Sequence, residues 1–304
     1  MSMRLVVTGA SGFIGTALCE ALLQQGHALT LLTRAAPRDA NTGTKRWLQW
    51  TPGTLKQWDA ALDGVEGVIN LAGEPIAQKR WTQAQRRRIE RSRIDATQGL
   101  VQACAKAKQR PHFLINASAV GYYGPCGDGI VTEETPPGDD FLGALCQRWE
   151  EQARKAEDLG LRVVRLRIGV VLGRGSPALA KMTVPFRLFV GGPLGSGRQW
   201  ISWIQIEDLV RLILESISNP GVQGAVNGTA PNPVRNREFG CTLGKVMQRP
   251  CWAPVPGFVL KLALGKMAEM LLTGQRVLPA AAGKFGFKFR YAELKQALEA
   301  CKPL

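Results

Sequence analysis

The sequence predicts an α/β fold built on a doubly wound parallel sheet, followed by a smaller, mixed C-terminal region. Three observations carry this prediction. Strand and helix patterns alternate at short intervals through the first half of the chain. A glycine-rich loop joins the first strand to the first helix, and beyond residue 173 the composition shifts toward glycine and proline.

The elements of the first half follow from short apolar runs and from apolar residues at helical spacing. Strands are expected at residues 4–8, 28–33, 68–71, 113–117 and 163–171, and helices at residues 13–25, 82–106 and 141–159. Gly26 is expected to stop the first helix. The stretch that contains Trp47, Trp50 and Trp58 is expected to be irregular.

The loop after the first strand carries glycines at spacings of three. Gly9 permits a tight strand-to-helix turn, Gly12 lets the backbone approach a pyrophosphate, and Gly15 allows the helix to pack closely on the strand. The helix N-terminus would offer free N–H groups and the positive end of its dipole to the phosphates. The predicted cofactor contacts of this loop are Gly9, Ser11, Gly12, Phe13, Ile14 and Gly15.

This loop and its setting predict a Rossmann-type domain that binds a nicotinamide dinucleotide. The domain is expected over residues 1–173, completed by part of residues 200–230. Residues 174–304 would form a smaller substrate-facing region, with a C-terminal subdomain from about residue 250. With 304 residues and 45% hydrophobic content, the chain can form one large domain with a buried core, alone or with a small appended region.

The end of the second expected strand favours NADP over NAD. An acidic residue there would bind the ribose 2′-hydroxyl of NAD, whereas a basic residue meets the 2′-phosphate of NADP. The strand ends at Thr33-Arg34, and the Arg34 guanidinium can bind phosphate in a forked geometry. Arg38 could assist it. The alternative is that Arg34 is a solvated loop residue.

The net charge of +15 raises the question of a nucleic-acid partner. The densest basic run has Glu90 and Asp95 interleaved and no aromatic platform beyond Trp81. A solvated helix face with some cofactor contacts is therefore favoured over nucleic-acid binding. The run consists of Arg86, Arg87, Arg88, Arg91 and Arg93.

Several other classes of protein are not expected. The best apolar stretches, 161–172 and 258–270, are interrupted by arginines or lysines, which argues against a membrane span. The short segment before the glycine-rich loop leaves no room for a signal peptide, so a cytoplasmic protein is expected. The seven cysteines form no CxxC pair and only two histidines occur, so neither a disulfide framework nor a metal site is predicted.

Taken together, the loop 9–15, the segments 70–73 and 118–124, and the run 203–208 resemble the extended short-chain dehydrogenase/reductase family of epimerases and dehydratases. Longer strings resemble an atypical subgroup, labelled epimerase-family proteins, that ends in a small C-terminal domain of unknown function. These strings are Asn70–Ile76, Lys79–Trp81, Gly121–Gly124, Leu145–Glu150 and Gly191–Gly197.

The resemblance implies further cofactor contacts. Leu71, Ala72 and Gly73 would line the adenosine, and Arg167 and the residues up to Val170 would lie beside the nicotinamide. Thr33 and Arg34 match the subgroup's site for the 2′-phosphate. Arg93 is a further candidate on the long helix, with plain surface charge as the alternative.

The sequence departs from the family's pattern at the catalytic residues. Ordinary members use a Tyr and, four residues later, a Lys whose charge lowers the phenol pKa so that the phenol can exchange a proton with the substrate hydroxyl. Spacing from Glu150 places Leu142 at the Tyr position and Cys146 at the Lys position. The residues that could replace this Tyr and Lys are Ser118, Tyr122, Tyr123 and Cys146. The alternatives are that the two tyrosines only pack over the cofactor and that Cys146 is an inert buried thiol.

The leading hypothesis is an NADP-dependent oxidoreductase or epimerase-like enzyme that acts on an unidentified small molecule. Arg187 and Arg198, near Gln199 and Trp200, would suit an anionic ligand, while loop and homodimer surface is the alternative interpretation of these residues. Because the usual Tyr and Lys are missing, an NADPH-responsive binding or regulatory protein without turnover stays open.

Overall fold

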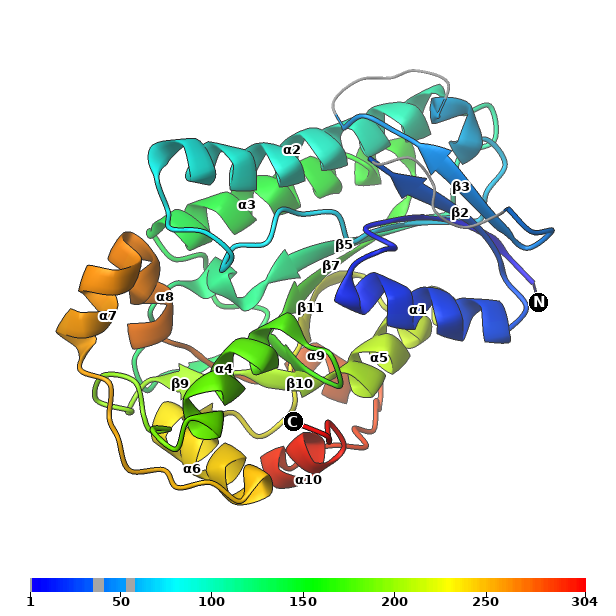
Figure 1. Ribbon diagram of the computed structural model, residues 1–304. Coiled ribbons are helices and arrows are strands. Elements are labelled where there is room, and N and C mark those ends of the chain that lie inside the picture. Colours follow the sequence, from blue (N-terminus) through cyan, green and yellow to red (C-terminus); the bar gives the residue numbers. More distant parts are fainter. Residues whose placement is uncertain (1, 35–40, 53–57) are drawn as a thin grey trace.

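The computed structural model describes residues 2–34, 41–52 and 58–304. At its centre lies a seven-stranded sheet in the order β11-β7-β5-β4-β1-β2-β3, in which every neighbouring pair is parallel (Figure 1). The predicted doubly wound α/β fold is thereby confirmed. The strands are β1 (Arg4–Thr8), β2 (Ala28–Thr33), β3 (Lys45–Gln49), β4 (Gly67–Asn70), β5 (Phe113–Ala119), β7 (Arg162–Ile168) and β11 (Gly224–Gly228).

Helices cover both faces of the sheet (Figure 1). The strand residues alternate between two cores: Leu5 and Val7 pack on one face with Leu18 and Leu212, whereas Val6 packs on the other. The pairs α1 with α5 and α2 with α3 lie against each other on opposite faces. Burial on both faces explains why the strands read as apolar runs rather than as alternating patterns. These helices are α1 (Phe13–Gln24), α2 (Gln83–Lys106), α3 (Phe141–Arg154) and α5 (Ile206–Ser218).

Several predicted element ends are confirmed by local chemistry. Gly26 has a φ of 80°, the left-handed conformation that ends helices, and it follows α1. The Thr82 hydroxyl accepts a hydrogen bond from the Gln85 N–H at 3.1 Å and so caps α2. Asp140 caps α3 in the same way, by accepting from the Gly143 N–H at 2.8 Å.

Three expected elements were wrong in detail. The strand predicted over 163–171 is interrupted at Gly169: β7 ends at Ile168, and β8 (Val170–Leu172) pairs instead with β10 (Trp203–Gln205). A side chain at Gly169 would collide with the Ser202 carbonyl, so the close approach of two chains sets this break. The helix predicted over 141–159 ends at Arg154, with a short 3-10 turn, Glu157–Leu159, after it. Trp47 lies in β3 rather than in irregular chain.

The remaining elements form a smaller body along the carboxyl side of the sheet (Figure 1). Its core contains Trp203, Phe239 and Leu298. Although α5 and β11 lie beyond residue 200 in the sequence, they complete the large sheet layer. The elements of the smaller body include β6 (Ile130–Val131), α4 (Pro177–Arg187), β9 (Trp200–Ile201), β12 (Val234–Arg235), α6 (Asn236–Met247), α7 (Gly257–Leu264), α8 (Glu269–Leu272), β13 (Arg276–Val277) and α10 (Leu294–Glu299), whereas α9 (Ala280–Lys284) packs against β11.

A buried polar network joins the strands to α2 beneath the loops of the sheet. The Asn70 amide donates to Thr97 Oγ1 at 2.9 Å and to Asn116 Oδ1 at 2.6 Å, and it accepts from the Thr8 hydroxyl at 2.6 Å. All four residues are fully buried. Because satisfied buried polar groups hold a single geometry, this network fixes the ends of β1, β4 and β5 relative to one another.

Among the described residues, no helix is both long and apolar enough to cross a membrane.

Candidate functional site

The predicted site residues meet at one edge of the sheet. The loop 9–15 follows β1, residues 71–73 follow β4, residues 120–123 follow β5, and Gly169 follows β7. The carboxyl ends of parallel strands share one edge, and the strand order reverses next to β1. Ligands of open α/β sheets bind in the crevice at such a switch point.

The glycine-rich loop has the backbone geometry that a phosphate loop needs. Gly9 has a φ of 69°, and a Cβ there would lie 2.6 Å from the Leu71 carbonyl oxygen. A Cβ at Gly15 would overlap the Gly9 carbonyl. The Gly12 N–H donates to the Gly9 carbonyl oxygen at 3.0 Å and closes the turn. Both close approaches exclude any other residue at positions 9 and 15.

The N-terminus of α1 is left without a side-chain cap. Its N-cap residue is Gly12, no side chain of the described residues accepts from its first N–H groups, and its first turn carries no acid. Ser11 and Gly12 are exposed. Helices α2 to α5 differ, because each is capped by its own side chain, from Thr82, Asp140, Ser176 and Gln205. The open N–H groups of α1, at the positive end of its dipole, fit a pyrophosphate.

The end of β2 lies next to this loop, since β1 and β2 are paired throughout. Thr33 is half-buried and Arg34 is exposed. The Gln49 side-chain amide donates to the Arg34 carbonyl oxygen at 3.3 Å. The predicted helper Arg38 lies outside the described residues.

Arg93 is brought to the segment that follows β4. Its guanidinium donates to the Glu74 carbonyl oxygen at 3.1 Å and lies 5.1 Å from the centre of the Trp149 ring. A Cβ on Gly73 would come within 3.1 Å of the Arg93 Cζ atom. Burial lowers the pKa of Arg93. The side chain therefore faces the crevice beside residues 71–73 and is not part of the outer charged surface of α2.

Below the crevice, Glu150 and Arg167 form a buried ion pair in which each side chain is 2% exposed. Two parallel hydrogen bonds join them, from Arg167 Nε to Glu150 Oε1 at 2.8 Å and from Arg167 Nη2 to Glu150 Oε2 at 2.9 Å. Arg165 lies 3.4 Å from the same carboxylate. The Ser118 hydroxyl donates to Glu150 Oε1 at 2.7 Å. Ser118 is thus bound to the network, not to the open crevice.

The two candidate tyrosines have different surroundings. The Tyr123 hydroxyl donates to Asn227 Oδ1 at 2.6 Å and accepts from Arg167 Nη1 at 3.0 Å. Burial raises the pKa of Tyr123 to about 12, against the lowering effect of Arg167. The Tyr122 ring lies 3.5 Å from the Arg167 Cζ atom, and its hydroxyl has no hydrogen-bond partner in the described part of the chain.

The positions of the family's Tyr and Lys hold groups that cannot replace them. Leu142 packs against Gly121, whose ideal Cβ would lie 3.2 Å from the Leu142 Cβ atom. Cys146 is buried, and burial raises its pKa to about 12 despite the nearby Arg93. A protonated, enclosed thiol is a poor nucleophile.

Some functional neighbours were not predicted from the sequence. The Arg167 guanidinium, expected beside the nicotinamide, is occupied by Glu150, Tyr123 and the Glu133 carbonyl oxygen. Val170 donates its N–H to the Ser202 carbonyl oxygen at 2.8 Å. Asn227 was missed altogether. For the ion pair, the available signal was two arginines at alternate positions, 165 and 167, between apolar strand residues, which requires a buried acid nearby.

The downstream residues expected to face an anionic ligand are partly used by the protein itself. The Gln199 side-chain amide donates to the Leu271 carbonyl oxygen at 2.8 Å. The Trp200 ring lies between two guanidinium groups, those of Arg235 at 4.0 Å and Arg276 at 4.8 Å. Arg187 and Arg198 are exposed.

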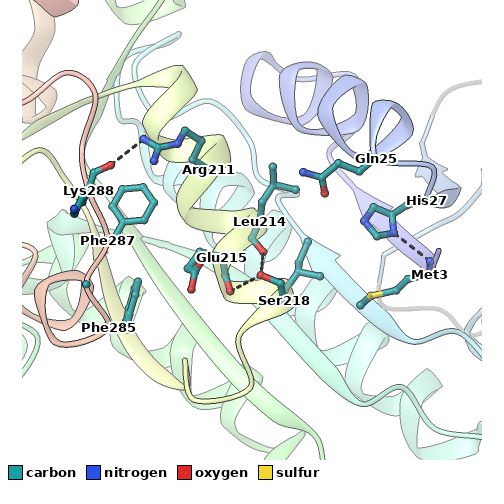
Figure 2. A pocket seen from close by; sticks show the side chains of 12 residues that line it. Met3, Gln25, His27, Arg211, Leu214, Glu215, Ser218, Phe285, Phe287 and Lys288 are labelled. Carbon is teal, nitrogen blue, oxygen red and sulfur yellow. Dashed lines mark hydrogen bonds between the residues drawn. The ribbon is translucent and has the colours of Figure 1, made fainter. Parts of the chain in front are cut away.

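A separate hollow of about 680 Å³ lies at the other end of the sheet, where β1 and β2 begin (Figure 2). Met3 and His27 line it together with Arg211, Phe287 and Lys288. His27 Nδ1 accepts from the Met3 N–H at 3.1 Å, and burial lowers the pKa of His27. Because the glycine-rich loop follows the opposite end of β1, this hollow is not part of the dinucleotide crevice.

Comparison with known proteins decides the family. A model of the NAD dependent epimerase/dehydratase family matches residues 5–227, and a model of a domain of unknown function, DUF1731, matches residues 255–301. The chain belongs to the NAD-dependent epimerase/dehydratase family. The resemblance to extended short-chain dehydrogenases/reductases is confirmed, together with the small C-terminal domain of the atypical subgroup.

Relatives of this subgroup match along nearly the whole chain. The chloroplastic epimerase family protein SDR39U1 homologue of Arabidopsis thaliana is 44% identical over 98% of this chain and 86% of its own length. The epimerase family protein YfhF of Bacillus subtilis is 40% identical over 97% of both chains. The crystal structure of the human epimerase family protein SDR39U1 with NADPH is 37% identical, with a TM-score of 0.89, over 98% of this chain and 99% of that one.

The Glu150→Gln variant is expected to lower the free energy of unfolding by about 3–5 kcal/mol, because it leaves two buried guanidinium groups without a counter-charge. Chemical denaturation monitored by circular dichroism would measure the change. Glu151→Gln is the matched control, since Glu151 is exposed on the same helix and should change stability by no more than about 0.5 kcal/mol. Equal stability of the two variants would contradict the assigned ion pair.

Tyr123 is expected to remain protonated well above the ordinary phenol range. Its pKa is about 12 in the folded chain and about 10 when unfolded, so the stability that the neutral phenol contributes is present below pH 10 and declines between these values. Phenolate absorbance of the native protein, compared with Tyr123→Phe, should show no Tyr123 ionisation up to pH 10. A difference that develops below this pH would show an accessible phenol instead.

Proposed function

We propose that this chain binds NADP(H) in preference to NAD(H), in the crevice at the carboxyl edge of its sheet. The single observation that carries the proposal is the uncapped N-terminus of α1 behind a loop in which Gly9 and Gly15 admit no side chain. The loop and helix would hold the pyrophosphate, and residues 71–73 with Arg93 would hold the adenosine side of the crevice. Arg34 would bind the 2′-phosphate.

The comparisons support the choice of coenzyme. The human relative, 37% identical, was crystallised with NADPH. Its similarity extends over nearly the whole of both chains, which supports a coenzyme crevice at the same place in this chain. The exposed guanidinium at the end of β2 is what a phosphate at that place would require.

We further propose that the chain is an oxidoreductase or epimerase-like enzyme that acts on a small molecule, and that the Tyr122 hydroxyl exchanges a proton with the substrate. The bound coenzyme would supply or accept the hydride. Ser118 and Tyr123 are held by Glu150, Arg167 and Asn227, whereas the Tyr122 hydroxyl has no protein partner among the described residues. Tyr122 is therefore the candidate that can donate or accept a proton at the substrate oxygen, and Arg167 fixes its ring.

A second candidate function is an NADPH-responsive binding or regulatory protein without turnover. The enclosed Cys146 and the side chain of Leu142 favour it, because they remove the cation and phenol that the wider family uses. Turnover distinguishes the two functions. If stoichiometric protein with NADPH and a carbonyl library, or with NADP and an alcohol library, converts nothing, the enzyme proposal fails and this one stands.

The Arg34→Ala variant is expected to bind NADPH about 30-fold more weakly, since it loses a charge-assisted contact to phosphate, while its affinity for NADH changes by no more than about twofold. Isothermal titration calorimetry with both coenzymes would measure this. Arg91→Ala, which removes an exposed arginine from α2, is the matched control and should leave both affinities unchanged. A parallel loss for NADPH and NADH would rule out the 2′-phosphate contact.

The Tyr122→Phe variant is expected to lower kcat by a factor of about 100 or more without changing the affinity for NADPH, because only the proton-exchanging hydroxyl is removed. Tyr123→Phe should be milder, since that hydroxyl orients Arg167 and does not touch the substrate. Steady-state kinetics on the substrate found by the library screen would give both values. The assignment is wrong if Tyr123→Phe proves the more damaging substitution.

A further inference from the structure

Helix α7 is an apolar helix without a core to bury it. Its eight residues read Gly-Phe-Val-Leu-Lys-Leu-Ala-Leu, and none of them is buried. Phe258 is 73% exposed and Leu262 is 79% exposed. A helix that is apolar on most sides normally lies inside a protein core or against a membrane. On the side turned to the protein, α7 packs against the turn Gly265–Ala268, and Arg80 Nη2 donates to the Leu262 carbonyl oxygen at 3.3 Å.

A second group of exposed apolar side chains adjoins the segment that leads into α7. Trp252 is 66% exposed, and its indole N–H donates to the Phe189 carbonyl oxygen at 2.9 Å. Phe189 has a φ of 62°, a conformation that a bulky residue keeps only when its surroundings hold it. The aromatic rings are therefore presented to solvent on a fixed backbone. We call the whole surface the apolar rim, formed by Leu188, Phe189, Val190, Trp252, Phe258, Val259 and Leu262.

The charged residues within the two stretches that carry the apolar rim are all positive. The sequence contains no Asp or Glu between Asp158 and Glu207, nor between Glu238 and Glu269, and the rim residues fall within these two stretches. The Arg249 guanidinium lies 4.5 Å from the centre of the Phe189 ring. The exposed cations of these stretches that lie within about seven residues of a rim residue in the sequence are Arg187, Lys245, Arg249, Lys261 and Lys266.

This combination restricts what can cover the apolar rim. A second copy of the chain would bring the same cations against one another, which opposes self-association through this surface. Exposed aromatic and aliphatic side chains beside lysines and arginines, on a short helix at the outer edge of the molecule, are the features of proteins that lie on a lipid surface (Figure 1). The anionic headgroups of a bilayer attract such cations within a Debye length.

We propose that the apolar rim binds peripherally to the surface of a bilayer that carries anionic phospholipids. Phe258, Leu262 and Trp252 enter the headgroup region, and the neighbouring lysines and arginines contact lipid phosphates. This is contact with one face of the bilayer, and it needs no membrane-spanning helix. It is independent of coenzyme binding, because the residues of the rim are not those of the crevice.

Sedimentation of the full-length chain with lipid vesicles tests the proposal. The chain is expected to bind vesicles that contain phosphatidylglycerol far better than vesicles of phosphatidylcholine alone, and to dissociate as salt is added. The double variant Phe258→Ser/Leu262→Ser should lose about tenfold or more in vesicle affinity, because two exposed apolar side chains no longer enter the headgroup region. Ile130→Ser is the matched control, since Ile130 is 59% exposed and lies outside the rim.

The circular dichroism spectra and NADPH affinities of the variants serve as controls for correct folding, because the removal of exposed side chains should change neither. Equal binding to both vesicle types, binding by the double variant at the level of the control, or no binding at all would each overturn the proposal. A dimer in light scattering that dissociates in the double variant would also overturn it, in favour of a second copy of the chain.

Discussion

The geometry of this molecule depends on the need to neutralise two buried arginines on one strand. Arg165 and Arg167 are two residues apart on β7, so both side chains leave the same face of the sheet. An isolated charge in a protein interior costs several kcal/mol, and Glu150 of α3 is the carboxylate that meets both. This contact ties α3 to β7, and the Ser118 hydroxyl ties it to β5.

The same ion pair determines which groups remain free for chemistry. It binds the hydroxyl of Ser118 directly and that of Tyr123 through Arg167, and it holds the ring of Tyr122 by stacking. In an ordinary member of the family, a lysine on α3 would supply the cation of the site. Here the cation beside the tyrosines is Arg167 on β7. Because Arg167 is paired with Glu150, it lowers the pKa of a neighbouring phenol less than an unpaired cation would. The side chains around the crevice thus differ from the Tyr and Lys of the wider family, and the proposed chemistry would have to use other groups.

The sequence was informative where function depends on backbone geometry and uninformative where it depends on distant partners. Gly9 and Gly15 could be identified because a tight turn and a close helix contact exclude any side chain, a local requirement that is visible in the residue type. The roles of Ser118 and Tyr123 could not be, since their partners Glu150 and Asn227 lie 32 and 104 residues away along the chain. Gly169 is an intermediate case. A glycine inside a strand pattern indicates that another group approaches the backbone closely, but only the fold shows that this group is the Ser202 carbonyl.

The net charge of +15 is better understood from where the cations lie than from their number. Arg165 and Arg167 are buried and neutralised, Arg93 lies beside residues 71–73, and Arg34 is exposed at the end of β2, where the proposed coenzyme phosphate would meet it. Lys261, Lys266 and Arg249 stand among exposed apolar side chains in a stretch without acids. A nucleic-acid surface would need cations aligned in one groove with few apolar neighbours, whereas these are divided among an interior, a crevice and an apolar rim. These cations thus fall into three groups: one pair is neutralised by Glu150, a second pair would meet the phosphates of the proposed coenzyme, and the rest would meet the proposed lipid headgroups, whereas Arg87, Arg88 and Arg91 of α2 are exposed.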